Sequence, residues 1–234
     1  MRVDSRASDA KRSVAIHRGY LKNAEGSALI EMGNTRVICS ATIDKGVPRF
    51  LYGKGEGWLT AEYGMLPRSS HQRITREAVR GRGGRTYEIQ RLIGRSLRSA
   101  TQLNLLGEVT VIIDCDVLEA DGGTRCAAIT GGCVALYDAL SKLNMDTHPM
   151  NFFVSAISIG VVDGQILLDL DYEEDSSADV DLNVVMSESG LFIEVQGTAE
   201  KVPFTGEQLQ QMLALAHNGC MELIDAQKQA LELV

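Results

Sequence analysis

Two short turns rich in glycine and arginine carry the residue types best suited to hold an anion. The first, DGGTR at residues 121–125, separates a strand-like stretch from a helix-like one. The first N–H groups of a helix lack internal partners and lie at its positive end, so such a turn can bind phosphate. Gly122 and Gly123 let the backbone approach a ligand, while Thr124 and Arg125 add donors. The alternative is an ordinary turn capped by Thr124, with Arg125 in solvent.

The second turn, GRGGRT at residues 81–86, precedes a predicted helix over residues 87–100. It presents Arg85 and ends a basic segment: residues 49–98 contain 11 Lys and Arg against 4 Asp and Glu, although the whole chain has a net charge of −8. A concentrated basic segment in an acidic protein indicates a polyanionic partner bound at one place. Arginines in a solvated surface are the alternative. The other arginines of this segment before the helix include Arg68, Arg73, Arg76, Arg80 and Arg82.

A dense acidic stretch lies farther along the chain. Residues 171–181 contain six carboxylates in eleven positions, and these repel one another unless a cation or a basic partner is bound there. Asp179 and Asp181 alternate into a predicted strand and therefore share a face. Carboxylate oxygens on a loop and a strand end suit Mg²⁺. A solvated acidic loop is the alternative.

The elements that must position these groups follow from the hydrophobic pattern. Residues 109–118 read as a strand with Asp114 and Asp116 on its polar face, and the following helix has one apolar stripe that ends at Leu143. Residues 44–85 show no clear period and are expected to form a long loop. Antiparallel strands are expected over residues 14–43, with turns at Gly26-Ser27 and Gly33-Asn34.

The C-terminal part repeats this order of strands followed by a helix. Strands are expected at 153–162, 166–170, 182–186 and 191–196, with a hairpin turn at Asp163-Gly164. A helix is expected over 206–229, preceded by a capping box from Thr205 to Gln208. Two α+β halves packed as a single domain, residues 1–234, fit this order.

The composition indicates whether the chain is expected to cross a membrane and in which compartment it lies. The chain has 44% hydrophobic residues but no apolar run of 18, so no membrane span is expected, and its first residues lack the apolar core of a secretory signal. Its five cysteines are odd in number and form no CxxC pair, which favours small core residues in a reducing compartment, the cytoplasm. The four histidines form no metal motif.

Five separated motifs make the chain resemble bacterial ribonuclease PH over nearly its full length. They are GWLTAEYGMLPRSS (57–70), GGRTYEIQRLIGRSLR (83–98), IDCDVLEADGGTR (113–125), EEDSSADVDLNVVM (173–186) and EVQGTAE (194–200). The resemblance implies the α+β ribonuclease PH fold, which is ribosomal protein S5 domain 2-like, with two βαβα-type halves. It also implies a homo-hexamer, a trimer of dimers. The implied activity is a reversible, phosphate-dependent 3′→5′ exoribonuclease that trims tRNA precursors and other RNA 3′ ends and releases nucleoside diphosphates.

The resemblance also implies roles for particular residues. Orthophosphate, the co-substrate, would be held by Arg85 together with Gly123, Thr124 and Arg125. Asp175 and Asp181 would bind Mg²⁺, and Asp181 could alternatively be the acid that protonates the leaving 3′-oxygen. The tRNA-contacting loop would use Arg68, Arg73 and Arg76. In this reading the catalytic residues are Asp181, Asp175, Arg85 and Arg125.

Two other functions are alternatives to this reading. A non-catalytic RNA-binding ring subunit of the exosome type should lack some of the residues named above, and all are present. A hydrolytic nuclease would release monophosphates. One position departs from the family pattern: Ser5 replaces a glycine in the N-terminal Arg-x-Asp-Gly-Arg motif, which would strain the backbone by about 1 kcal/mol if this position needs a positive φ.

Overall fold

The computed structural model describes residues 2–233, apart from the side chains of Ala78 and Arg80, so the expected basic side chain of Arg80 lies outside the described part. The first half of the chain contains β1 (Val14–Arg18), β2 (Gly26–Met32), β3 (Thr35–Lys45), η1 (Arg49–Leu51), β4 (Trp58–Met65), α1 (Glu77–Arg80), α2 (Gly84–Ser99), η2 (Leu103–Leu105), β5 (Val109–Glu119) and α3 (Thr124–Ser141). The second half contains β6 (Val154–Val162), β7 (Gln165–Leu168), α4 (Tyr172–Ser177), β8 (Val180–Ser187), β9 (Phe192–Ala199) and α5 (Gly206–Ala230).

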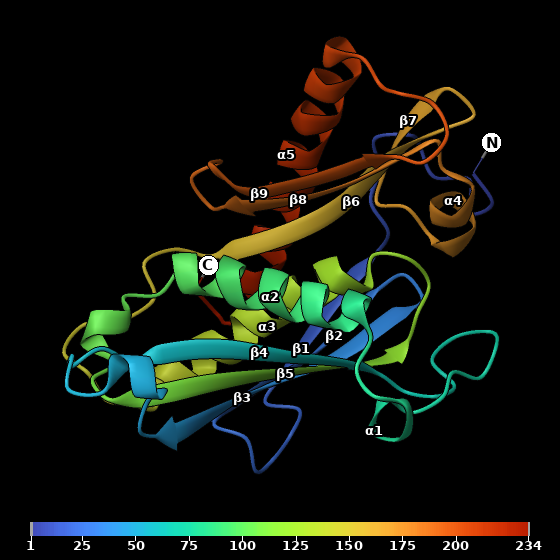
Figure 1. Ribbon diagram of the computed structural model, residues 1–234. Helices are drawn as coiled ribbons and strands as arrows, with labels where there is room; N and C mark the ends of the chain where they lie inside the picture. The colour runs from blue at the N-terminus through green and yellow to red at the C-terminus, as the bar shows by residue number, and fades with distance from the viewer. Residues whose placement is uncertain (1, 234) are drawn as a thin grey trace.

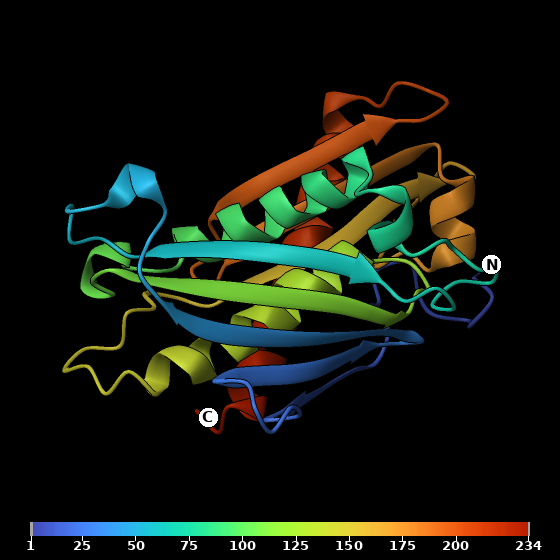
Figure 2. The ribbon, with the colours of Figure 1, turned by 60° about the horizontal axis from the view of Figure 1, so that its bottom comes forward.

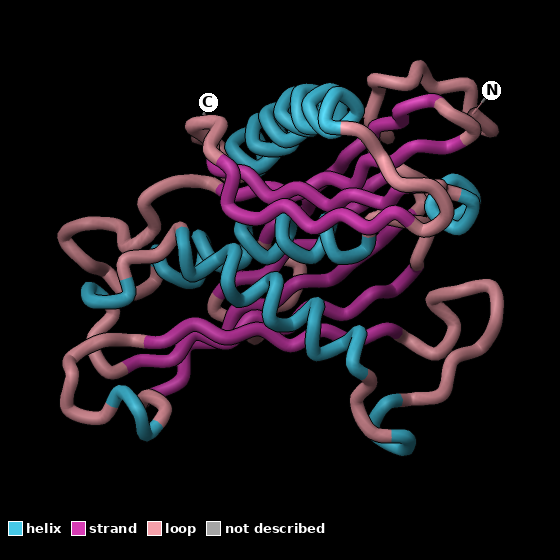
Figure 3. Tube along the Cα trace, turned by 45° about the horizontal axis from the view of Figure 1, so that its top comes forward, coloured by secondary structure: helices cyan, strands magenta, loops and turns pink. Residues whose placement is uncertain are grey.

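The strands form two sheets, and helices fill the space between them. The first sheet has the order β1-β2-β3-β5-β4 and the second has the order β7-β6-β8-β9. Helices α2 and α3 lie between the two sheets, and α5 covers the other face of the second sheet (Figures 1 and 3). The outer face of the first sheet is largely open, and the short helix α1 lies at one end of it (Figures 1 and 2). Buried residues of both halves belong to one hydrophobic cluster.

Helix α3 differs from the predicted single apolar stripe. It packs against β2 and β3 on one side and β6 on the other, so most of its residues are buried around the whole circumference. Small residues permit this close packing: a Cβ added at Gly131 would lie 2.7 Å from Ile30 Cγ2. Leu143 lies beyond the end of the helix at Ser141. The expected stripe is therefore only part of a helix that is enclosed by two sheets.

Two expectations for the N-terminal half were wrong. Residues 44–85 are not one long loop, because β4 lies within them and pairs in parallel with β5. Its inward residues Leu59, Ala61 and Tyr63 do alternate, but this short pattern lies at the sheet edge within a segment rich in glycine and arginine. Gly26 and Ser27 are not a turn; they begin β2. A Cβ at Gly26 would lie 1.9 Å from the Ala135 carbonyl oxygen, so this glycine is required by packing.

Most other elements match the prediction. Strand β5 runs to Glu119, and its partner across the sheet is β3. Asp163 and Gly164 both have positive φ, 49° and 74°, as a tight hairpin turn requires. The capping box of α5 is present. The acidic stretch differs in part, because six of its residues form the short helix α4 instead of a loop.

The remaining expectations concern local chemistry. All five cysteines are buried free thiols. Ser5 has a φ of 63°, so the position where the family pattern has glycine does adopt the left-handed conformation. No helix within residues 2–233 is both long enough and apolar enough to cross a membrane.

Candidate active site

The first anion-binding turn is rigidly supported. Gly122 and Gly123 have φ values of 73° and 64°, which glycine adopts readily. A Cβ at Gly122 would lie 2.3 Å from the Leu170 carbonyl oxygen, so the turn packs directly against the segment that leads to α4. Gly123 is the N-cap of α3 and no side chain caps this end. The first N–H groups of α3 are therefore available to a ligand.

Thr124 is not the N-cap, as the alternative interpretation required, but the first residue of α3. Its Oγ1 lies 2.9 Å from the hydroxyl of Tyr63, which is buried on β4. Arg125 follows it and is half-buried. The strand that the sequence analysis missed therefore supplies a direct contact to the candidate phosphate-binding turn.

The second turn is open. Arg85 is exposed in the first turn of α2, whose N-cap Gly83 has an extended conformation and no side-chain cap. A Cβ at Gly83 or Gly84 would meet nothing within 4 Å. The nearby ion pair uses another arginine, Arg82, which contacts Glu62 at 2.6 Å.

The two candidate carboxylates come from neighbouring elements of the second half. Asp175 lies on α4 and Asp181 on β8, and both are half-buried. Asn183, two residues along the same strand, donates from Nδ2 to both carboxylate oxygens of Asp181 at 3.3 Å. Helix α4 begins with a capping box in which Asp171 accepts from the Glu174 N–H. The position of each carboxylate is therefore fixed by the helix or strand that carries it.

Electrostatics connect the turns with the carboxylates. Burial raises the pKa of Asp175, and the positive charges of Arg85 and Arg125 partly oppose this rise. Burial, and then the negative charge of Asp175, raise the pKa of Asp181, whereas Arg125 lowers it. Burial also raises the pKa of Tyr63, against the effect of Arg85 and Arg125. The structure thus places the arginines of both turns close enough to the carboxylate pair for their charges to affect its pKa values.

Two other carboxylates of the acidic stretch are paired with basic side chains. Asp179 lies 3.7 Å from Lys201, and Glu174 forms a buried pair with Arg2 at 2.7 Å. Among the described residues, no group of three or more His, Cys, Asp or Glu side chains is arranged to hold a metal ion. The pair Asp175 and Asp181 nonetheless fits Mg²⁺, which commonly takes one or two protein carboxylates and completes its shell with water and substrate phosphates.

The three arginines expected to contact tRNA lie apart from this group. Arg68, Arg73 and Arg76 are exposed on the segment between β4 and α1. Arg68 lines a cleft of about 470 Å³ together with Asn34 and His71. The His71 ring lies 5.8 Å from that of Tyr172 at the start of α4, so the beginning of this segment is close to the helix that carries Asp175.

Sequence reasoning missed several residues of the site. Asn183 could have been found, because it alternates with Asp181 on one strand face. Tyr63 could not, because its strand was not recognised. Arg12 and Asp169 form a buried ion pair at 2.6 Å under the first turn, and only the tertiary structure brings them together.

A second group of carboxylates, separate from Asp175 and Asp181, lies on the first sheet. Glu62, Asp114 and Asp116 line a cleft of about 510 Å³ on the outer face of the first sheet. Burial raises the pKa of both Asp114 and Asp116, and Glu62 adds to the rise at Asp114. The polar face predicted for β5 is therefore confirmed.

Fold and site together define an α+β protein that presents two arginine-bearing helix starts to a half-buried carboxylate pair. The chain belongs to the 3′ exoribonuclease family: domain 1 of this family matches residues 10–141 and domain 2 matches residues 153–219.

Solved structures share the fold across nearly the whole chain. Rice (Oryza sativa) Rrp46 has 20% sequence identity and a TM-score of 0.80, covering 98% of this chain and 100% of its own. The Archaeoglobus fulgidus exosome with RNA bound to the active site has 21% identity and a TM-score of 0.81, covering 95% and 91% of the two chains. An archaeal exosome core has 21% identity and a TM-score of 0.77, covering 98% and 91%. The predicted α+β ribonuclease PH fold is therefore confirmed.

Proposed function

We propose that this protein is a phosphorolytic 3′→5′ exoribonuclease of the bacterial ribonuclease PH type, which shortens tRNA 3′ ends and releases nucleoside diphosphates. The observation that carries the proposal is the shared electrostatic neighbourhood of Arg85, Arg125, Asp175 and Asp181. Phosphorolysis must place two anions side by side, the attacking phosphate and the scissile phosphodiester. Two cationic turns facing a carboxylate pair provide that arrangement.

In this mechanism inorganic phosphate is the nucleophile, so no side chain has to form a covalent intermediate. Arg125, the Thr124 hydroxyl and the first N–H groups of α3 would bind the phosphate, with Arg85 reaching it from the second turn. A phosphate oxygen forms a bond to the last internucleotide phosphorus. The bond from that phosphorus to the neighbouring 3′-oxygen breaks, and this oxygen takes up a proton. The reverse reaction adds a nucleotide and releases phosphate.

The carboxylate pair has two alternative roles, which differ in the protonation of Asp181. Mg²⁺ bound by Asp175 and Asp181 would offset the negative charge of the scissile phosphodiester. The raised pKa of Asp181 also makes it a suitable acid, able to deliver a proton to the leaving 3′-oxygen from its carboxyl group. A titration of the rate against Mg²⁺ at several pH values separates the roles, because a metal ligand must be ionised and an acid must be protonated.

We further propose that the protein is a cytoplasmic homo-hexamer. The exposed arginines Arg68, Arg73 and Arg76 then hold the body of a tRNA, with the grip and the active site coming from different subunits of the ring. Three phosphate contacts should give binding a salt dependence with a slope near −0.9 per phosphate, by analogy with duplex DNA. The likeness to an archaeal exosome core supports an assembly of several subunits, and five buried thiols suit a reducing compartment.

Identification of the reaction products tests the proposed chemistry. A short single-stranded RNA is incubated with Mg²⁺, with and without inorganic phosphate, and the products are separated by chromatography. Nucleoside diphosphates formed only with phosphate are the expected result. Monophosphates would instead indicate hydrolysis. Bound but uncut RNA would indicate the non-catalytic ring subunit.

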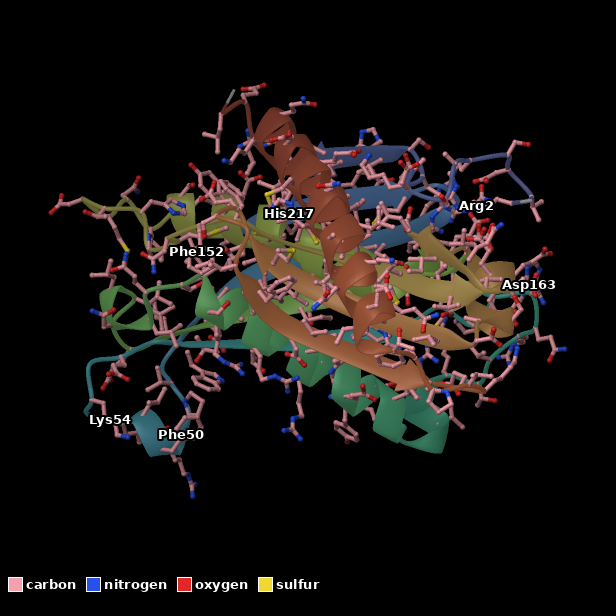
Figure 4. The ribbon with its side chains drawn as sticks, turned by 90° about the horizontal axis from the view of Figure 1, so that it is seen from above. Arg2, Phe50, Lys54, Phe152, Asp163 and His217 are labelled. Atoms are coloured by element: carbon pink, nitrogen blue, oxygen red, sulfur yellow. The ribbon has the colours of Figure 1, made fainter. Side chains whose placement is uncertain are left out.

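A matched pair of triple variants tests the tRNA grip. Replacement of Arg68, Arg73 and Arg76 by alanine should weaken tRNA binding and reduce its salt slope, while phosphate-dependent cleavage of short RNA continues. The control replaces three other exposed basic residues: Lys45, Arg49 and Lys54. Lys54 lies at the opposite end of the molecule from Arg2 (Figure 4). Unchanged tRNA affinity in the first variant would refute the grip, and light scattering checks that the oligomer survives.

A further inference from the structure

A buried guanidinium group lies directly beneath the candidate phosphate-binding turn. Arg12 has only 5% of its surface exposed, and its partner Asp169 has none. The Arg12 side chain donates from Nη2 and Nε to the two oxygens of Asp169, at 2.6 and 3.0 Å. Its backbone N–H donates to the same carboxylate at 2.7 Å. This is a bidentate pair with an additional backbone contact, an arrangement that fixes both partners in direction as well as distance.

The same side chain also contacts the turn itself. Arg12 Nη1 donates to the carbonyl oxygen of Asp121, the residue that begins the turn. A Cβ added at Gly123 would lie 3.0 Å from Arg12 Nη2 and 3.8 Å from Asp169 Oδ1. The Arg12–Asp169 pair therefore forms the floor on which the turn before Thr124 and Arg125 rests.

Asp169 continues this support toward the carboxylate pair. Its backbone has a φ of 56°, and its N–H donates to the Ser158 carbonyl at 2.7 Å. The next residues, Leu170 and Asp171, pack against Gly122 and lead into α4. The N-terminal segment runs beside α4 in two views (Figures 1 and 2).

A second arginine of the N-terminal segment secures α4. Arg2 donates from Nε and Nη2 to the two oxygens of Glu174, at 2.7 and 2.8 Å, and from Nη2 to the carbonyl of Leu168 at 2.9 Å. Glu174 directly precedes Asp175. One short segment thus contacts both components of the site, which come from opposite halves of the chain.

We propose that Arg12 is a positioning residue: it fixes the phosphate-binding turn of the first half against the segment of the second half that carries Asp175. The inference rests on the proposed function. A misplacement of about 1 Å between reacting groups can reduce the rate about 100-fold, so this contact is expected to set the rate although Arg12 does not touch substrate.

The chemistry of the pair explains why arginine is needed. A lysine ammonium is a single point charge and cannot reach Asp169 and the Asp121 carbonyl with the same planar fork. Loss of Asp169 leaves the Arg12 charge buried without this carboxylate, and loss of Arg12 leaves Asp169 with only the more distant Arg6, whose Nη1 lies 3.7 Å from Oδ2. Arg12→Lys is therefore the informative change, because it keeps the charge and removes only the geometry.

The test measures kcat and the KM for phosphate on short RNA for wild type, Arg12→Lys and Asp169→Asn. It is run at a temperature below the unfolding transition of all three. We expect kcat/KM for phosphate to fall by about 10- to 100-fold in both variants, with a rise in KM. Arg18→Lys is the matched control, because Arg18 makes a similar bidentate pair with Asp138 near the other end of α3, at 2.7 and 3.2 Å.

A core variant, Leu223→Ala, controls for stability alone, because Leu223 is fully buried on α5 and belongs neither to the turn nor to the carboxylate pair. If Arg12→Lys loses stability to the same extent as Leu223→Ala but keeps wild-type kcat and KM, its role is structural only and the proposal is refuted. The increase in melting temperature on adding inorganic phosphate should be smaller in Arg12→Lys than in wild type. If the wild-type protein binds phosphate but forms no nucleoside diphosphates, the proposed function is refuted. The comparison of phosphate binding between wild type and Arg12→Lys would still be valid.

Discussion

The two glycine-arginine turns have similar sequences, GGTR and GGRT, but opposite surroundings. The turn before α3 is enclosed: Gly122 packs on the backbone of the second half, and Thr124 contacts the buried Tyr63 hydroxyl. The turn before α2 is exposed, and additional atoms at Gly83 would meet nothing within 4 Å. A motif of two glycines and an arginine therefore does not determine how rigid an anion site is. The residues packed behind it do.

This difference assigns separate tasks to the two turns. A fixed turn can hold a small anion in one position, which is what an attacking phosphate needs. An open turn with an exposed arginine can adjust when substrate arrives. Arg125 lowers the pKa of both candidate carboxylates, whereas Arg85 is among the causes only at Asp175. Arg125 of the enclosed turn thus acts on both carboxylates, while at Asp175 the effect of Arg85 is the larger of the two.

The largest expected effect is at Asp181, which faces the enclosed turn. Asp181→Asn should nearly abolish turnover, because the variant can neither bind a metal ion with full charge nor donate a proton. Its free energy of unfolding at pH 7 should increase, because burial and Asp175 raise the pKa of Asp181 in the folded state.

The sign of the pH dependence follows from that raised pKa. As pH increases from the ordinary value of 3.8 through the folded-state value, wild type loses stability that the variant keeps. The stability difference should vanish below that ordinary value. Urea unfolding at several pH values measures it. A variant that is less stable than wild type at pH 7 would contradict the prediction.

The next effect compares the glycines of the two turns. Gly122→Ala should destabilise the protein by roughly 3 kcal/mol, from the positive φ and the clash with the Leu170 carbonyl. Gly84→Ala, in open space, should stay within about 0.5 kcal/mol of wild type. Thermal unfolding of both variants measures these two changes in stability. Equal losses would show that the two turns are equally constrained.

The arginines themselves provide a smaller contrast. Arg85→Ala and Arg125→Ala should each cost about 1.5–3 kcal/mol of phosphate binding, seen as a raised KM for phosphate, with RNA binding largely intact. Lysine should restore more function at 85 than at 125, because an exposed side chain can reposition its charge and a half-buried one cannot. Arg91→Ala, an exposed arginine on the same helix α2, is the control. Wild-type phosphate dependence in Arg85→Ala would refute its role.

The smallest effect tests the support of the enclosed turn. Tyr63→Phe removes one hydroxyl and leaves the buried Thr124 Oγ1 without this partner, so stability should fall by about 1–2 kcal/mol. The KM for phosphate should also rise modestly, because Thr124 is freer to rotate. Calorimetry and phosphate titrations measure the two effects. A stability loss with an unchanged KM would limit Tyr63 to a structural role.

Local patterns in the sequence were sufficient for much of this molecule. The Asp163-Gly164 hairpin and the capping box of α5 follow from contacts between residues close in the chain, and strand β5 was recognised by the alternation of its own residues. Arg85 and Arg125 were likewise found by type and spacing, whereas the family resemblance selected Asp175 and Asp181 from the acidic stretch. The roles proposed for them stay predictions. These features are determined by near neighbours, and periodicity and turn chemistry report on near neighbours.

Tertiary structure decided the remaining features. Strand β4 was hidden because its short alternating pattern lies among glycines, prolines and arginines, and its identity depends on pairing with β5. Helix α3 is apolar all round because a second sheet, from the other half of the chain, covers its far side. The Arg12–Asp169 pair joins residues that are 157 positions apart. No local pattern encodes such a pair, because its energy comes from burial and charge pairing that exist only after both halves have folded together.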